Sequence, residues 1–154
     1  MSYIDNNLMS GERVIYRTNL HWIVFLWPII LFVTAIVLFF IGGGVAIAIG
    51  VILIILALII WLFSFIDYKT SEFGITDKRV MVKIGFIQRK STEILLDKVE
   101  SIQVDQGILG RMFNFGSITI IGTGGTKDPF HKIANPLEFR KKAQEQIASI
   151  QNLK

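Results

Sequence analysis

The feature that most constrains this chain is an apolar stretch, residues 22–66, that contains no Asp, Glu, Lys, Arg or His. A transmembrane helix needs about 20 apolar residues, so this stretch is about twice as long as one span requires. Glycines occupy positions 42–44, near its middle, and a run of glycine favours a reversal of the chain. The sequence therefore predicts two transmembrane helices, at 22–41 and 45–66, joined as a tight hairpin.

An even number of spans returns the chain to the side of the membrane from which it started. The cationic residues that flank the stretch are Arg13, Arg17, Lys69, Lys78, Arg79 and Lys83. By the positive-inside rule, we expect a multi-pass protein of the cytoplasmic membrane with both termini in the cytosol. A cleaved signal peptide ending at 46–48 is the alternative. It is disfavoured because the apolar stretch is longer than an h-region and residues 1–21 carry no net positive charge.

Small residues recur every four positions within the stretch, at Gly42, Ala46 and Gly50. Such a pattern allows two helices to pack closely, either inside the hairpin or between two copies of the chain. No ionisable residue interrupts either predicted span, whereas ion and proton pathways through membranes usually contain such residues. The spans therefore do not indicate a pump or carrier.

Beyond Asp67 the apolar pattern changes to short alternating segments separated by turns, which is typical of antiparallel strands. The pattern predicts strands at 68–76, 79–84, 87–96, 99–106, 117–122 and near 130–134. Residues 107–116 are apolar but do not alternate, so they predict a one-turn helix or a packed loop. A β-rich domain is thus expected to begin at residue 67.

The C-terminal segment carries the signals of a helix start, with Asn135 as N-cap, Pro136 at the first helical position and Glu138 three residues after the cap. Apolar residues then repeat along one side of a helix to about residue 151. We expect an N-terminal cytosolic segment at 1–21, the hairpin at 22–66, and an α+β PH-like domain at 67–154. In that domain an antiparallel β-roll is capped by a helix at 136–151.

Several short motifs carry a family resemblance. They are Gly11-Glu12-Arg13-Val14, Ile75-Thr76-Asp77-Lys78-Arg79-Val80, Lys83-Ile84-Gly85, Val99-Glu100-Ser101-Ile102-Gln103-Val104, Gly110-Arg111, Phe115-Gly116-Ser117-Ile118 and Ile133-Ala134-Asn135-Pro136. In this order they resemble the bacterial PH-like domain of the membrane-flanking (YdbS-like) family, in which membrane hairpins precede such a domain. The resemblance implies an anchoring or interaction module and no common catalytic reaction.

No residue pattern indicates catalysis. The two histidines, His21 and His131, lie in different segments and the chain has no cysteine, so we predict no metal site and no cofactor. Acidic residues among the predicted strands are interpreted as solvated positions instead of general acid/base pairs. The glycine-rich segment 122–126 lacks the spacing of a Walker motif and predicts a hairpin turn, with a small anion-binding nest beside Lys127 left open.

The chain has a formal net charge of +4, and all of this excess lies after the apolar stretch, where it suits an anionic membrane surface. Arg79, Lys83, Lys90 and Lys127 are candidate contacts for lipid headgroups or other anions. The alternative explanation is that these charges serve general solubility and the positive-inside topology of the membrane hairpin. No basic stripe interleaved with aromatic residues indicates a nucleic-acid partner.

The sequence favours a membrane-anchored, non-enzymatic interaction or scaffold module with PH-like architecture. We expect the lipid bilayer as one partner, a protein of unknown identity as another, and a homo-oligomer as a candidate assembly. A module that senses anionic lipids is the first alternative. A subunit of a membrane transport or enzyme complex is the second.

Overall fold

The computed structural model describes residues 3–85, 90–123, 125 and 127–151, with only the backbone described at 127 and 128. The chain divides into two compact units. Met1–His21 and Thr70–Lys154 form one of them, here called the β-rich unit, and Trp22–Lys69 form the other, here called the helical hairpin. The β-rich unit is therefore built from segments on both sides of the apolar stretch.

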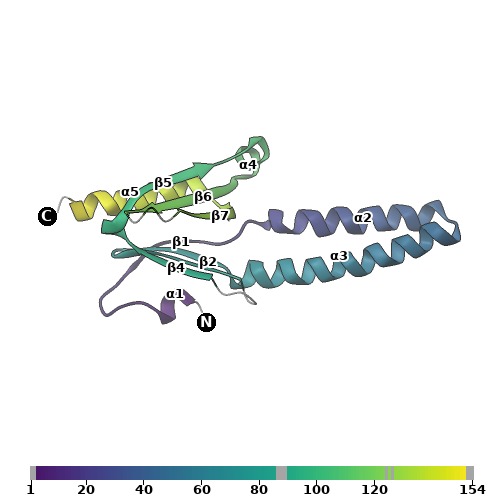
Figure 1. Cartoon of the computed structure of the whole chain (residues 1–154), viewed down its shortest axis with the longest axis horizontal. Helices are drawn as coiled ribbons and strands as arrows, with labels where there is room; N and C mark the ends of the chain where they lie inside the picture. Colours follow the sequence, from purple (N-terminus) through teal and green to yellow (C-terminus); the bar gives the residue numbers. More distant parts are fainter. Residues whose placement is uncertain (1–2, 86–89, 124, 126, 152–154) are drawn as a thin grey trace. The chain divides into compact units, whose positions relative to one another are not determined.

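Two antiparallel sheets make up the β-rich unit (Figure 1). The first sheet has the order β1-β2-β3-β4, with strands Val14–Thr18, Glu72–Thr76, Arg79–Ile84 and Lys90–Leu95. The second sheet has the order β5-β6-β7, with strands Val99–Asp105, Phe115–Gly122 and Lys127–Ala134. A short 3-10 helix, η2 (Leu96–Lys98), connects the sheets. In both sheets the neighbouring strands are consecutive in the described chain, with the hairpin inserted between β1 and β2 and a short helix between β5 and β6.

The core of this unit lies between the sheets and is closed by the C-terminal helix α5 (Pro136–Gln151). Phe73 of the first sheet and Phe130 of the second pack edge to face, with ring centroids 6.0 Å apart. Phe139 of α5 is buried and packs in the same manner against Tyr16 of β1, at 6.3 Å. The predicted combination of antiparallel strands and a C-terminal capping helix is confirmed.

The N-terminal segment belongs to this unit and is not a separate part of the chain, which corrects the predicted division at 1–21. Strand β1 pairs with β2, with Thr18 opposite Phe73. The short helix α1 (Tyr3–Asn6) places Ile4 against Gly74 of β2, and Ile4 is almost fully buried. Because Gly74 has no side chain, it leaves the space that Ile4 fills.

Several element boundaries differ from the predictions or are settled by the structure. Residues 68–70 continue a helix, so β2 starts at Glu72 instead of at 68. The strand predicted at 87–96 is described from Lys90, and residues 86–89 lie outside the described part of the chain. The segment left open as a helix or a loop forms α4 (Ile108–Phe113), which ends where Asn114 adopts a left-handed conformation with φ of 58°.

The helical hairpin consists of the 3-10 turn η1 (Trp22–Phe25) followed by α2 (Leu26–Ile41) and α3 (Gly44–Thr70). Gly42 and Gly43 reverse the chain with φ of 79° and 89°, values that residues with side chains rarely adopt. By length and composition, the segments Trp22–Ile41 and Gly44–Thr70 are sufficient to cross a bilayer. Most of their large apolar side chains are exposed on the protein surface.

Candidate functional site

A buried polar cluster, formed by Glu12, Thr76, Arg79 and Glu93, lies on the face of the first sheet that also carries α1. Arg79 follows the turn between β2 and β3, and its guanidinium donates to both carboxylate oxygens of Glu12, from Nε to Oε1 and from Nη2 to Oε2, each at 3.0 Å. Its Nη1 also pairs with Glu93 of β4. The side chains of Arg79 and Glu12 are only 8% and 0% exposed, so this pair is almost completely desolvated.

The carboxylate of Glu12 accepts further hydrogen bonds. The hydroxyl of Thr76 donates to Oε1 at 2.7 Å, and the backbone N–H of Met9 donates to Oε2 at 2.7 Å. Burial alone would raise the pKa of Glu12, but the hydrogen bonds from Arg79, Met9 and Thr76 outweigh it and hold this pKa at about 2. The carboxylate therefore stays ionised at neutral pH.

The hydrogen bonds from Arg79 to Glu12 also raise the pKa of the guanidinium, so the ion pair keeps both charges across the physiological range. A general acid or base needs a pKa near the working pH. This cluster instead holds the N-terminal segment against the sheet, because Glu12 and the carbonyl oxygen of Asn7 both bind Arg79. The predicted candidate sites did not include Glu12. The Gly11-Glu12-Arg13-Val14 motif in the family resemblance was the sequence signal for it.

The three candidate anion contacts whose side chains the structure describes, Arg79, Lys83 and Lys90, do not converge on one site. Arg79 is buried and bound to carboxylates, so the structure gives it an internal role in place of the predicted headgroup contact. Lys83 lies over the ring of Tyr3, with its Nζ 5.1 Å from the ring centroid. Lys90 lies 6.0 Å from the ring centroid of Phe130, and the side chain of Lys127 is outside the described part of the structure.

The strand register explains why Lys83 and Lys90 are separated. Lys83 pairs with Ser91, and Ile84 pairs with Lys90. Because successive side chains of a strand alternate between the two faces of a sheet, Lys83 and Lys90 point to opposite faces. A shared anion would therefore have to reach around the end of the β3–β4 pair.

The glycine-rich segment connects β6 to its antiparallel neighbour β7, so the predicted hairpin turn is confirmed. Within it, the N–H of Gly125 donates to the carbonyl oxygen of Gly122 at 2.9 Å, and Gly125 has φ of 72°. Residues 124 and 126 lie outside the described chain. The anion-binding nest beside Lys127 stays a prediction.

The predicted helix-packing residues occupy different positions in the hairpin. Gly50 faces α2, and a Cβ atom at this position would lie 3.1 Å from the carbonyl oxygen of Ala35. Ala46 is half-buried, one turn nearer the hairpin tip, whereas Gly42 lies in the turn itself. The close approach at Gly50 is therefore made inside the hairpin, which is one of the two arrangements that the sequence left open.

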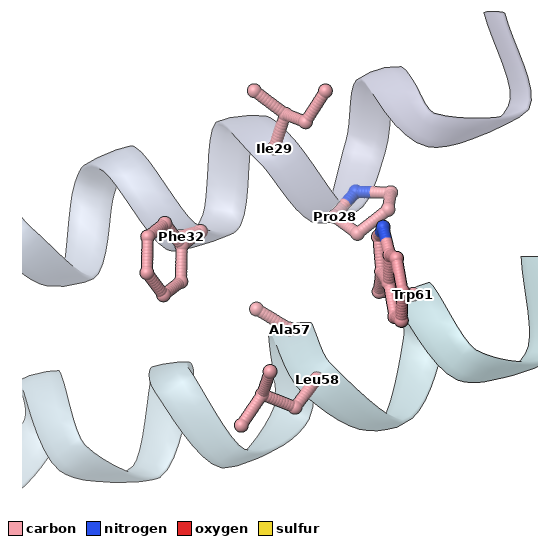
Figure 2. A pocket seen from close by; sticks show the side chains of 6 residues that line it. All are labelled: Pro28, Ile29, Phe32, Ala57, Leu58 and Trp61. Carbon is pink, nitrogen blue, oxygen red and sulfur yellow. The ribbon is translucent and has the colours of Figure 1, made fainter. Parts of the chain in front are cut away.

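A cavity of about 310 Å³ opens between α2 and α3 near the start of α2 (Figure 2). Its lining is entirely apolar and consists of Pro28, Ile29, Phe32, Ala57, Leu58 and Trp61. No lining side chain carries a charge, and the indole N–H of Trp61 is the only side-chain hydrogen-bond donor among the six. The cavity is therefore suited to hydrocarbon and not to a polar substrate.

Comparison with known proteins gives one family. The profile of the family described as bacterial PH domain matches residues 23–149, which is most of the chain. No curated protein and no solved structure matches the chain significantly. The antiparallel sheets and the C-terminal helix agree with this match. The chain belongs to the bacterial PH domain family.

Proposed function

We propose that this protein is a membrane-anchored, non-enzymatic interaction module of the YdbS-like type. The observation that supports it most strongly is the place at which the apolar hairpin is inserted. The hairpin lies between β1 and β2, which are adjacent antiparallel strands of one sheet. The β-rich unit is thus attached to it through His21 and Thr70, at both ends of the insertion.

The strand pairing constrains the topology of such an anchor. Thr18 lies opposite Phe73, so both connections to the hairpin leave the same end of the sheet. If the hairpin crosses the bilayer twice, the entire β-rich unit lies on one side of it. The flanking cations favour the cytosolic side.

The surface of the hairpin supports burial in lipid. Phe40, Val45 and Trp27 are 83%, 76% and 65% exposed, and further exposed apolar side chains occur along the length of both helices. An apolar surface of this extent is unfavourable in water and favourable in hydrocarbon. The apolar cavity between α2 and α3 would then hold a lipid acyl chain.

The interaction role rests on the β-rich unit. Strand β4 is one of the two terminal strands of the first sheet, and its described pairing is with β3 alone. A terminal strand can pair with an extended segment of a partner protein or of a second copy. The buried charges at Glu12 and Arg79 stabilise the unit and do not serve as proton donors or acceptors.

A cysteine-accessibility experiment tests the anchor, since the chain has no native cysteine. Gly44→Cys places a thiol at the start of α3 beside the hairpin turn, and Ser149→Cys places one on the exposed side of α5. In intact cells, a membrane-impermeant maleimide is expected to label position 44 alone. In inverted membrane vesicles, it is expected to label position 149 alone. Labelling of both positions from one side would overturn the membrane-spanning hairpin.

Photo-crosslinking tests the interaction role. A crosslinking amino acid at Lys90, on terminal strand β4, is compared with one at Gln103, an exposed position of β5. Capture of one reproducible protein, or of a second copy, from position 90 and not from 103 supports docking on β4. Capture of lipid alone at position 90 would favour the lipid-sensing alternative.

A further inference from the structure

Helix α4 presents large apolar side chains to the surface of the β-rich unit. The exposed fractions are 83% for Ile108, 56% for Leu109, 70% for Met112 and 44% for Phe113. Large apolar side chains of a surface helix normally face the core. A contiguous group of exposed apolar side chains on so short a helix indicates a surface that is covered by lipid or by the apolar surface of another protein.

Local contacts hold α4 in this orientation. Gly110 is the buried residue of the helix, and a Cβ atom there would lie 2.6 Å from the carbonyl oxygen of Phe115. The side-chain amide of Gln106 donates to the carbonyl oxygens of Gly110 at 3.3 Å and Phe115 at 3.0 Å. The helix therefore packs against the rest of the unit through Gly110. The contacts of Gly110 and Gln106 keep its large apolar side chains pointing away from the unit.

The C-terminal end of α4 lies beside the residue from which the chain continues into the hairpin. The ring of His21 stacks on Phe115, with centroids 5.2 Å apart, and also hydrogen-bonds to the backbone of Phe113. The backbone N–H of His21 donates to the carbonyl oxygen of Lys132 at 2.7 Å. Trp22, the next residue, begins the first apolar segment. If that segment enters a bilayer, α4 is close to the point of entry.

The charges near α4 favour a lipid surface over a protein partner as the occupant. Arg111 on the helix and Lys132 beside His21 are both exposed, and residues 106–126 contain no acidic residue. The acidic residue closest to α4 in the sequence is Asp105, at the end of β5. Apolar side chains flanked by cations are typical of elements that lie in the interface of an anionic membrane.

We propose, on the basis of the membrane anchor proposed above, that α4 inserts Ile108, Leu109 and Met112 into the interfacial region of the bilayer that the hairpin spans. This second contact restricts the orientation of the β-rich unit relative to the membrane. It also leaves the terminal strand β4 available to a partner, because the lipid contact is made by the second sheet's connection between β5 and β6.

A lipid-quenching experiment on the full chain tests the proposal. Met112→Cys carries an environment-sensitive fluorophore, and Ser149→Cys on α5 carries the same fluorophore as a control. Both proteins are reconstituted in vesicles of phosphatidylethanolamine and phosphatidylglycerol, with or without lipids brominated near the glycerol end of the acyl chain. We expect the brominated lipids to reduce the fluorescence at position 112 at least twofold and to leave position 149 unchanged.

The native tryptophans separate the two proposals. Trp22, Trp27 and Trp61 all lie in the helical hairpin, so their quenching by brominated lipid reports the anchor alone. Quenching of the tryptophans without quenching at position 112 would overturn the α4 contact and leave the anchor standing. Unquenched tryptophans would overturn both. A label at 112 that is shielded from both brominated lipid and aqueous iodide would show a protein occupant and also overturn the lipid contact.

Discussion

Glu12 and Arg79 are 67 positions apart in the sequence and form a bidentate ion pair that is almost completely buried. The pair joins the segment before the apolar hairpin to a strand that follows it. Together with the β1–β2 pairing, it makes the β-rich unit one body despite the insertion of the hairpin. The N-terminal segment is thus a structural part of the PH-like domain.

Removal of the Glu12 carboxylate is expected to destabilise this unit strongly. Glu12→Ala leaves the Arg79 guanidinium buried without its main partner, and the loss of one member of a buried pair costs about 3–5 kcal/mol. Hydrogen exchange of the full chain in detergent micelles measures the effect. We expect faster exchange of the amides of β1, β2 and β3, and unchanged exchange in the helical hairpin.

Glu145→Ala is the matched control. Glu145 pairs with Lys142 on α5 at 3.0 Å, but its side chain is 45% exposed, and an exposed pair of this kind contributes at most about 1 kcal/mol. Equal effects of the two substitutions would show that the burial of the Glu12–Arg79 pair has no energetic consequence.

The stability of the β-rich unit should fall in acid through protonation of Glu12. The pKa of this carboxyl is about 2 in the folded protein and 4.5 ordinarily, so its contribution is complete above pH 4.5. It decreases as the pH falls from 4.5 to 2 and is absent below that range. We expect the difference in unfolding free energy between the wild type and Glu12→Gln to shrink across this interval. A difference that does not change between pH 7 and pH 2 would contradict the low pKa.

Local patterns were sufficient to predict much of this fold. The apolar stretch and its glycines indicated the hairpin, since both signals lie within consecutive residues. The alternation at 79–84 predicted β3 with the observed bounds, and the cap at Asn135 and Pro136 predicted the start of α5. These elements are determined by their own side-chain periodicity and turn residues.

The role of Arg79 could not be predicted in the same way. In the sequence it is one of several cations near an apolar stretch, and only the three-dimensional packing brings Glu12 to it. The pairing of β1 with β2 depends likewise on a register across the whole hairpin. In β1, exposed and half-buried residues alternate and only Thr18 is buried. The strand therefore has no clear apolar periodicity in the sequence.

Packing inside the hairpin should depend on Gly50. In Gly50→Leu, the new side chain meets the backbone of Ala35, where a Cβ atom alone would be 3.1 Å from the carbonyl oxygen. Overpacking of this kind costs about 1–3 kcal/mol. Tryptophan fluorescence during titration with a denaturing detergent measures it, because every tryptophan of the chain lies in the hairpin. Gly44→Leu, at a position with open space, is the control and should have no comparable effect. Equal stability of the Gly50→Leu and wild-type hairpins would contradict the close packing.

Excision of the hairpin should yield a folded β-rich unit that no longer needs detergent. Thr18 and Phe73 are already paired, so the ends at His21 and Thr70 can be joined by a short linker of about four Gly, Asn and Ser residues. Such a linker converts β1 and β2 into an ordinary β-hairpin without changing their register.

The excised protein is expected to show the circular dichroism of a mixed α and β domain, with a cooperative thermal transition. Because α4 remains exposed in it, Ile108→Ser and Met112→Ser are included to limit self-association through this surface. A second protein with Glu12→Ala in the same background should melt at a lower temperature. This difference in melting temperature depends on the native ion pair between Glu12 and Arg79, so a collapsed, non-native state would not show it. An excised chain that is soluble but has no cooperative transition would show that the hairpin is needed to hold β1 against β2.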